Sequence, residues 1–361
     1  MNAYDYLALH RNVNRIVGNE FIDNTVEINS SINLKKSIEN LIDNGYLYIS
    51  EEPNITLQKL KVPELKEILR NNNLKVGGNK PQLIERILEN YSSIKIDNEL
   101  PKVYKATEKG MDLIQNTNYI DHFANNYAIS LIRATAIAQN DINSDDKIEF
   151  IYLHEVKRLL NDNDISELNL VLHSLVIYYQ KNSNDKDKIR QFTNISHYTS
   201  VLRNIDDESR YYGIPVSEYV LSASQNEKFY ESLLLVDKIP PNVFVELFMK
   251  DVENFYNKTM PYTKEVAQYL VADVLKDNNT KSSILNLLNK NTHDIHEHKT
   301  YEVKAQSTNN TVKQSTPKQK INSNIKKHEK HSNDEQQNAL YGCGCLIAII
   351  IFVTGCTALA F

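Results

Sequence analysis

The sequence predicts a mainly α-helical protein that contains one small two-stranded hairpin near its N-terminus. Apolar residues recur at three- and four-residue spacing over most of residues 119–290, which is the spacing of a buried helical stripe. Two short runs, 46–49 (YLYI) and 103–106 (VYKA), carry the residue types typical of strands. Glycine is scarce, with nine in the 361 residues, and none of them forms a nucleotide-binding loop.

Residues 1–118 are predicted to form a small N-terminal domain in the order helix, strand, excursion, strand, helix. The expected helices cover about residues 31–44 and 107–115, and Thr107 can cap the second. This is the order of a winged helix whose wing is the excursion. The strings LIDNGYL and YKATEKG resemble those that flank the wing in winged-helix regulators. A plain hairpin under the excursion is the alternative.

Residues 57–90, inside this excursion, carry the most informative pattern in the chain. Leu65 and Leu69 fall on one face of a first amphipathic helix, and Leu83 and Ile87 turn a second helix back onto it. A unit of about 35 residues is too small to build a large core. We therefore expect it to present a surface rather than a pocket.

The turn between these two helices has residue types that suit phosphate contact. Gly78, after Gly77, allows positive φ and close approach of a partner, and Asn79 can cap the second helix. A helix N-terminus flanked by Lys75 and Lys80 is an anion-binding arrangement. Residues 57–90 hold seven Lys and Arg against four Glu, so the unit is locally basic.

This pattern resembles the SAP domain, a helix–turn–helix module of chromatin-organising and DNA-processing proteins. The resemblance runs over residues 56–90, about a tenth of the chain, and suggests an insertion at the wing tip, where few contacts are broken. It implies duplex DNA binding, often A·T-rich, with modest sequence preference, through the turn and the start of the second helix. The positions that it assigns to DNA contact are Lys61, Lys75, Gly78, Asn79, Lys80 and Arg86. A helical hairpin that binds protein, or that is purely structural, is the alternative.

Residues 119–290 are predicted to form an all-α domain of about seven helices with a substantial core. They carry 24 acidic against 18 basic side chains, so we expect DNA contact only in the N-terminal part. His154 and His173 lie among apolar residues and are expected to be interior rather than catalytic. The predicted stripes include Ile120, Phe123, Tyr127, Leu131 and Ala134 in the first helix, and Val243, Leu247, Phe248 and Val252 in a later one.

The C-terminal part is predicted to be a tether and an anchor. Residues 291–338 are polar and nearly free of aromatic side chains, which is typical of a disordered linker. Residues 339–361 contain no charged residue and have about the length that spans a lipid bilayer as one helix. The lysines that precede this transmembrane tail anchor predict that the N-terminal bulk lies in the cytoplasm. A tail buried in an oligomer or lying on a membrane surface is the alternative, and Cys343 and Cys345 are candidates for lipid attachment.

These patterns predict a membrane-tethered DNA-binding protein with no enzymatic activity. No nucleophile elbow or other catalytic signature is present, so we expect no catalytic residue, no cofactor and no metal site. The helical domain is expected to recruit a protein partner. The alternative is a membrane-anchored adaptor that binds proteins and no DNA. The abundance of Asn, Lys and Ile suggests the A·T-rich genome of a bacterium or its phage.

Overall fold

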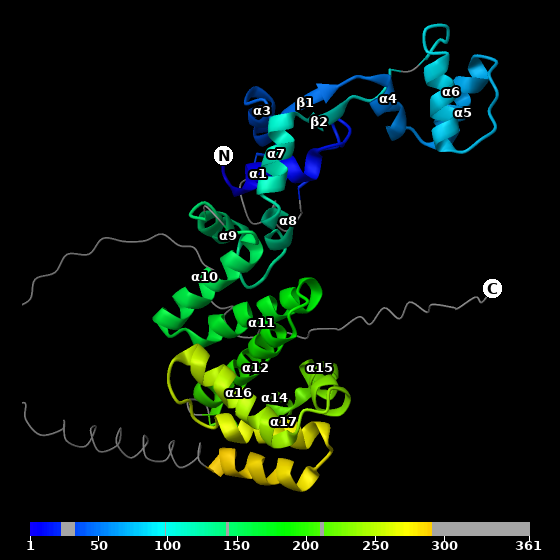
Figure 1. The fold of residues 1–361 in the computed structure, drawn as a ribbon. Coiled ribbons are helices and arrows are strands. Elements are labelled where there is room, and N and C mark those ends of the chain that lie inside the picture. Colours follow the sequence, from blue (N-terminus) through cyan, green and yellow to red (C-terminus); the bar gives the residue numbers. More distant parts are fainter. Residues whose placement is uncertain (23–32, 98, 142–143, 210–212, 291–361) are drawn as a thin grey trace, which may run out of the picture. The chain divides into compact units, whose positions relative to one another are not determined.

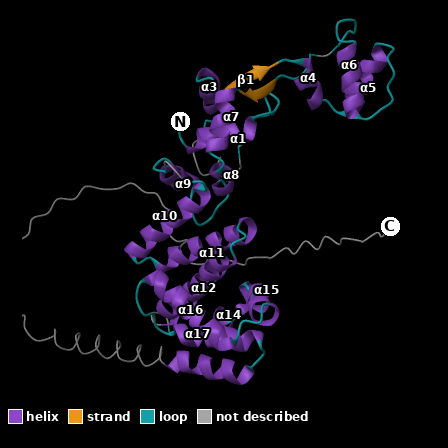
Figure 2. Cartoon of the chain, in the orientation of Figure 1, coloured by secondary structure: helices purple, strands orange, loops and turns teal. Residues whose placement is uncertain are grey.

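The computed structural model describes residues 1–22, 33–97, 99–141, 144–209 and 213–290 (Figure 1). Helices dominate this part of the chain, together with one two-stranded sheet, which confirms the mainly α-helical class (Figure 2). The predicted linker and tail anchor lie outside the described residues. Within the described ranges, no helix has both the length and the apolar character needed to cross a membrane.

The two predicted strands pair between helices in the predicted order. β1 (Leu47–Ser50) runs antiparallel to β2 (Val103–Ala106), with Leu47 opposite Ala106 and Ser50 opposite Val103. The hairpin is preceded by α3 (Leu34–Asp43) and followed by α7 (Glu108–Asn116). The winged-helix relationship stays a prediction.

An N-terminal helix that the sequence reasoning missed, α1 (Ala3–Asn12), packs against this hairpin unit. Its Ala8 and Leu9 are fully buried in one cluster with Ile38 and Leu41 of α3. The opposite side of α1 buries Leu7 in the core of the helical region. Because α1 contributes to both clusters, its side chains lie where residues 1–118 and 119–290 meet, and the domain boundary there stays a prediction.

The excursion between the strands folds around a core of its own. It comprises α4 (Pro53–Thr56), a 3₁₀ turn η1 (Leu57–Lys59), α5 (Val62–Asn71) and α6 (Lys80–Glu89). The residues that are fully buried in this core are Leu57, Leu65, Leu69, Leu83 and Ile87. The predicted pair of amphipathic helices is therefore present, preceded by a short turn that adds Leu57 to the core.

The remaining described residues form a series of helices. Two short stretches, η2 (Asn204–Ser209) and η4 (Ser232–Val236), adopt the wider π-helical winding. A last helix covers residues 278–290, where the described part ends. The bounds are α8 (Tyr119–Phe123), α9 (Leu131–Ala138), α10 (Lys147–Asp162), α11 (Ile165–Asn182), α12 (Lys186–Arg203), η2 (Asn204–Ser209), α14 (Glu218–Leu221), η3 (Ala223–Gln225), α15 (Glu227–Glu231), η4 (Ser232–Val236), α16 (Pro241–Tyr256) and α17 (Thr263–Val274).

The prediction that one helix contains the stripe from Ile120 to Ala134 was wrong, because the chain turns between α8 and α9. The Asn126 side chain accepts hydrogen bonds from the Ala128 and Ile129 N–H groups at 2.9 and 3.0 Å, which replaces helical pairing with a local turn. Ser130 then caps α9. Tyr127, predicted to be in the stripe, is consequently 66% exposed.

Two further details of the predicted stripes were wrong. Along α16 the buried face contains Phe244 and Phe248, whereas Val243 is exposed, so the stripe begins one residue later than predicted. His154 is exposed on α10 rather than interior, while His173 on α11 is half-buried. Both errors arise because one apolar neighbour does not fix which side of a helix meets the core.

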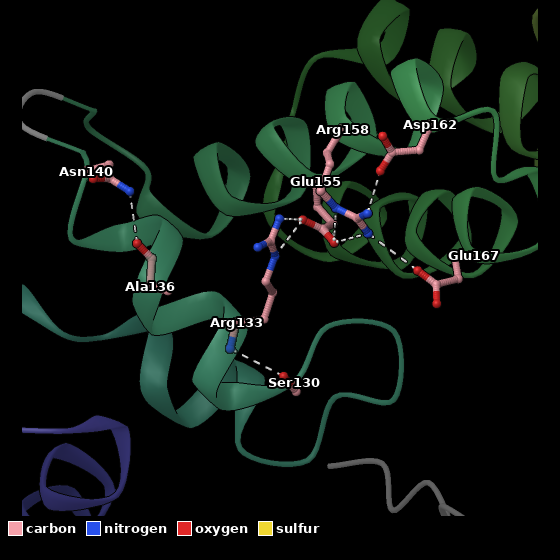
Figure 3. A network of polar contacts seen from close by, with 8 residues as sticks. All are labelled: Ser130, Arg133, Ala136, Asn140, Glu155, Arg158, Asp162 and Glu167. Carbon is pink, nitrogen blue, oxygen red and sulfur yellow. Dashed lines mark hydrogen bonds and ion pairs between the residues drawn. The ribbon is translucent and has the colours of Figure 1, made fainter.

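A polar network centred on Glu155 joins three of these helices (Figure 3). The buried carboxylate of Glu155 on α10 receives hydrogen bonds from Arg133 of α9 at 3.0–3.1 Å and from Arg158 at 2.7–3.0 Å. Arg158 also contacts Asp162, at 2.8 Å, and Glu167 of α11, at 3.4 Å. Burial opposes ionisation of Glu155, but the bonds from the two guanidinium groups outweigh it and hold the pKa of this carboxyl below its usual range.

Candidate nucleic-acid interface

The turn between α5 and α6 is held by contacts at both of its ends. Helix α5 ends at Asn71, and the positive φ of 56° at Asn73 lets the Leu74 N–H donate to the Leu69 carbonyl at 2.8 Å. Helix α6 starts at Asn79, whose side chain accepts from the Gln82 N–H at 3.2 Å. The Gln82 side chain accepts in return from the Asn79 N–H at 3.0 Å, which completes a capping box.

Gly78 is required by this geometry. Its φ is +128°, a conformation that residues with a side chain rarely adopt, and a Cβ there would lie 2.8 Å from the Gln82 Oε1 atom. Gly78 therefore lets the chain pass directly beside the capping box. The positive φ that the sequence allowed is present at Gly78, and the close approach of a partner stays a prediction.

Three backbone N–H groups between residues 77 and 80 are open to a ligand. Those of Gly77, Gly78 and Lys80 have no acceptor among the described residues. Proline at position 81 has no N–H, and the Gln82 N–H is occupied by Asn79, so the helix N-terminus itself offers one donor only. An anion would thus be bound mainly by the glycine amides that precede α6, and less by the helix dipole than the sequence suggested.

Lysine side chains flank these amides. Lys75 is exposed, and its ammonium group forms no hydrogen bond or ion pair among the described residues. The Lys80 ammonium donates to the Gln58 carbonyl at 2.7 Å, which ties the start of α6 to the 3₁₀ turn η1. An ammonium group has three donors, so two of those on Lys80 stay available.

Arg86 has a structural role in the turn in addition to the DNA contact that the resemblance predicts for it. Its Nη1 atom donates to the Lys75 carbonyl at 2.6 Å and to the Gly77 carbonyl at 3.0 Å. These bonds close the turn over the second helix. Arg86 therefore positions Lys75 and the glycine amides, whether or not its remaining N–H groups reach DNA.

A hollow of about 450 Å³ lies beside the turn. Lys75, Gly78 and Arg86 line it, but so do the carboxylates of Glu85 and Glu89. Because like charges repel, these two carboxylates disfavour a phosphate inside the hollow. The outer edge of the turn, where Lys75 and the open amides lie, is the more favourable place for an anion.

The structure thus brings five of the six predicted DNA contacts together in one turn and the adjoining helix: Lys75, Gly78, Asn79, Lys80 and Arg86. The sixth, Lys61, is exposed at the start of α5, where its N–H donates to Glu64. Sequence reasoning missed the parts played by Gln82 and Gln58. The spacing of Asn79 and Gln82 is that of a capping box, and this signal could have identified Gln82.

Comparison with curated proteins finds no match to the chain. Comparison with protein families finds a match to the SAP domain over residues 56–92. That range contains α5, the turn and α6, and all six of the predicted contact residues. The match confirms that this segment of the chain is of the SAP domain family, as its sequence pattern predicted.

Proposed function

We propose that the protein binds duplex DNA through the SAP turn, with Lys75 and the amides of Gly77, Gly78 and Lys80 as the phosphate contacts. The observation that carries this proposal is the SAP family match combined with three open amides beside an exposed lysine. Backbone contact of this kind gives weak sequence selectivity and strong salt dependence.

We further propose that the protein is not an enzyme and that residues 339–361 anchor it in a membrane, with the folded part in the cytoplasm. The tail is uncharged, and the lysines that precede it favour this orientation. DNA bound at residues 56–92 is then held near the bilayer, and the helical region recruits a protein partner. Co-flotation of the 361-residue chain with vesicles, lost on removal of residues 339–361, tests the anchor. If the 361-residue chain does not float with the vesicles, the anchor proposal is contradicted.

Fluorescence anisotropy of the 361-residue chain on A·T-rich and G·C-rich duplexes, at two salt concentrations, tests DNA binding. We expect salt-sensitive binding to both duplexes. Lys75→Glu should lower the affinity about tenfold and reduce the salt slope by about one, the loss of one phosphate contact.

Lys258→Glu is the matched control, because Lys258 is exposed on the helical region and the substitution changes net charge equally. It should leave DNA affinity unchanged. If the wild-type chain shows no binding even at low salt, the proposal fails. The alternative, a membrane-anchored adaptor for proteins alone, then becomes the better reading of the same residues.

A further inference from the structure

The SAP unit continues beyond residue 92, where the family match ends. After α6 the chain returns to the end of α5, and there the Asn72 side chain is bonded twice to the backbone of Lys95. It accepts from the Lys95 N–H and donates to the Lys95 carbonyl, both at 2.8 Å. Ile94 and Leu100 pack against the core of the unit. Residues 93–97 are therefore held on the SAP unit by polar and apolar contacts together.

Contacts at the two ends of the unit show that α5 and α6 run side by side in the same direction. The Lys80 ammonium, at the start of α6, donates to the Gln58 carbonyl just before α5, so both helices begin near the same end. Both also finish near the same end, because Asn72 follows α5 and its partner Lys95 follows α6. The turn, residues 73–79, must therefore return along the length of the helices.

This path sets the order of the cationic groups along the unit. Arg86 holds the turn beside α6 through the Lys75 and Gly77 carbonyls. The open amides lie toward the start of α6, Lys75 lies along the turn, and Asn72 with Lys95 lies at the far end. Three residues of extended chain cover at most about 11 Å, which is about three steps of 3.4 Å along one DNA strand. Lys95 thus comes next in line after Lys75.

The Lys95 ammonium is available to an anion. Its side chain is 87% exposed, and its one ion pair is a 3.5 Å contact with the exposed Asp97 carboxylate. Such a pair is weak because water screens it. The Asn71 side chain also donates to Asp97, at 3.3 Å, so this carboxylate keeps a partner when the ammonium turns away. A phosphate can therefore replace Asp97 beside Lys95.

We propose that Lys95 is a further phosphate contact of the SAP unit, positioned by Asn72. One DNA strand then lies along the turn, from the open amides past Lys75 to Lys95. This inference rests on the DNA binding proposed above and extends the contact surface to residues outside the family match. Because its ligand is the sugar-phosphate backbone of duplex DNA, the contact adds affinity without base selectivity.

Fluorescence anisotropy of the 361-residue chain on a duplex, at two salt concentrations, tests this contact through Lys95→Met. The substitution removes the charge and keeps an apolar stem at an exposed position. We expect affinity to fall about fivefold and the salt slope to decrease by about one, the loss of one phosphate contact. Lys258→Met, at an exposed position of the helical region, is the matched control and should change neither quantity.

Asn72→Ala tests the positioning, because it removes both bonds to the Lys95 backbone. In this background Lys95→Met should change affinity about twofold or less, whereas Lys75→Met should keep its full effect. Hydrogen–deuterium exchange should be faster at residues 93–97. An equal effect of Lys95→Met with and without Asn72 would overturn the positioning role.

The outcome for the wild-type chain separates this inference from the proposed function. If the wild-type chain binds DNA and Lys95→Met binds it equally well with the same salt slope, the Lys95 contact is excluded while DNA binding stands. If the wild-type chain itself binds no DNA, the proposed function fails and the Lys95 contact fails with it. Lys95→Met gives this answer even if Asn72→Ala does not fold.

Discussion

Arg86 illustrates how a side chain can hold a binding surface in shape as well as lie beside it. Its guanidinium spans the Lys75 and Gly77 carbonyls, so it holds the loop that carries the open amides. In the sequence it is one more basic residue of a SAP pattern. In the structure it lies on α6 and faces the turn. Its two hydrogen bonds to backbone carbonyls hold the turn against the helix.

Arg86→Met should destabilise the SAP turn by about 1–3 kcal/mol, because two hydrogen bonds to a charged donor are lost while the apolar stem is kept. Hydrogen–deuterium exchange should show faster exchange of the amides at the start of α6, and DNA affinity should fall with it. Lys75→Met is the matched variant, since Lys75 lies on the same turn and its ammonium group forms no hydrogen bond or ion pair within the described part of the chain. It should weaken DNA binding with exchange unchanged, and wild-type exchange in Arg86→Met would refute the positioning role.

At the scale of elements, helix α7 packs closely against the start of the hairpin at Gly110, which has no side chain. The Thr107 hydroxyl donates to the Gly45 carbonyl at 2.7 Å and accepts from the Gly110 N–H at 3.0 Å, so the cap also fixes α7 on the preceding turn. A Cβ on Gly110 would lie 2.1 Å from the Tyr46 carbonyl oxygen. This approach is closer than any side chain permits.

Gly110→Ala should therefore destabilise the protein, although alanine replaces glycine favourably in most helices by about 1 kcal/mol. The backbone at Tyr46, just before β1, must separate from α7, and overpacking of this kind costs about 1–3 kcal/mol. Thermal unfolding followed by circular dichroism measures the effect. Asp112→Ala, at an exposed position of α7, is the control and should leave stability equal or higher. A more stable Gly110→Ala variant would show that α7 can move away from the hairpin.

At the scale of the whole molecule, the Glu155 network connects three successive helices. Arg133, Glu155 and Glu167 come from α9, α10 and α11, respectively, and Arg158 links the last two (Figure 3). The Glu155 carboxylate is the shared acceptor. Removing it leaves two guanidinium groups without their buried partner, which affects the packing of three helices at once.

This network makes stability depend on pH in a defined direction. Because the pKa of Glu155 is lower in the folded protein than its ordinary value of 4.5, its contribution is complete at neutral pH and is lost as the pH falls below that value. Glu155→Gln should cost about 2 kcal/mol at pH 7. The difference between variant and wild type should shrink on acidification. Melting temperatures measured from pH 7 to pH 3 test this, and a difference that stays constant with pH would exclude the linkage.

The sequence by itself determined the helical class, the two strands and the SAP unit, because these depend on local signals. Periodic leucines and isoleucines, an Asn cap and glycines at a turn act within a few residues. The same signals predicted that residues 119–290 form a series of helices. They failed at the break between α8 and α9, where the Asn126 side chain competes with helical hydrogen bonds.

Only the tertiary structure decided which polar side chains form hydrogen bonds within the protein and which face solvent. Arg86, His197 and Glu155 look alike to a sequence pattern, since each is a polar residue on an amphipathic helix. Their roles follow from partners brought close by folding: the Lys75 carbonyl, the Leu221 backbone and two arginines. Such contacts join residues 3 to 24 positions apart, most of them on different elements, and burial sets the strength of each. Local residue spacing specifies neither which distant residue a polar side chain will contact nor how deeply the contact will be buried. The role of a polar residue is therefore determined only once the fold has placed its neighbours around it.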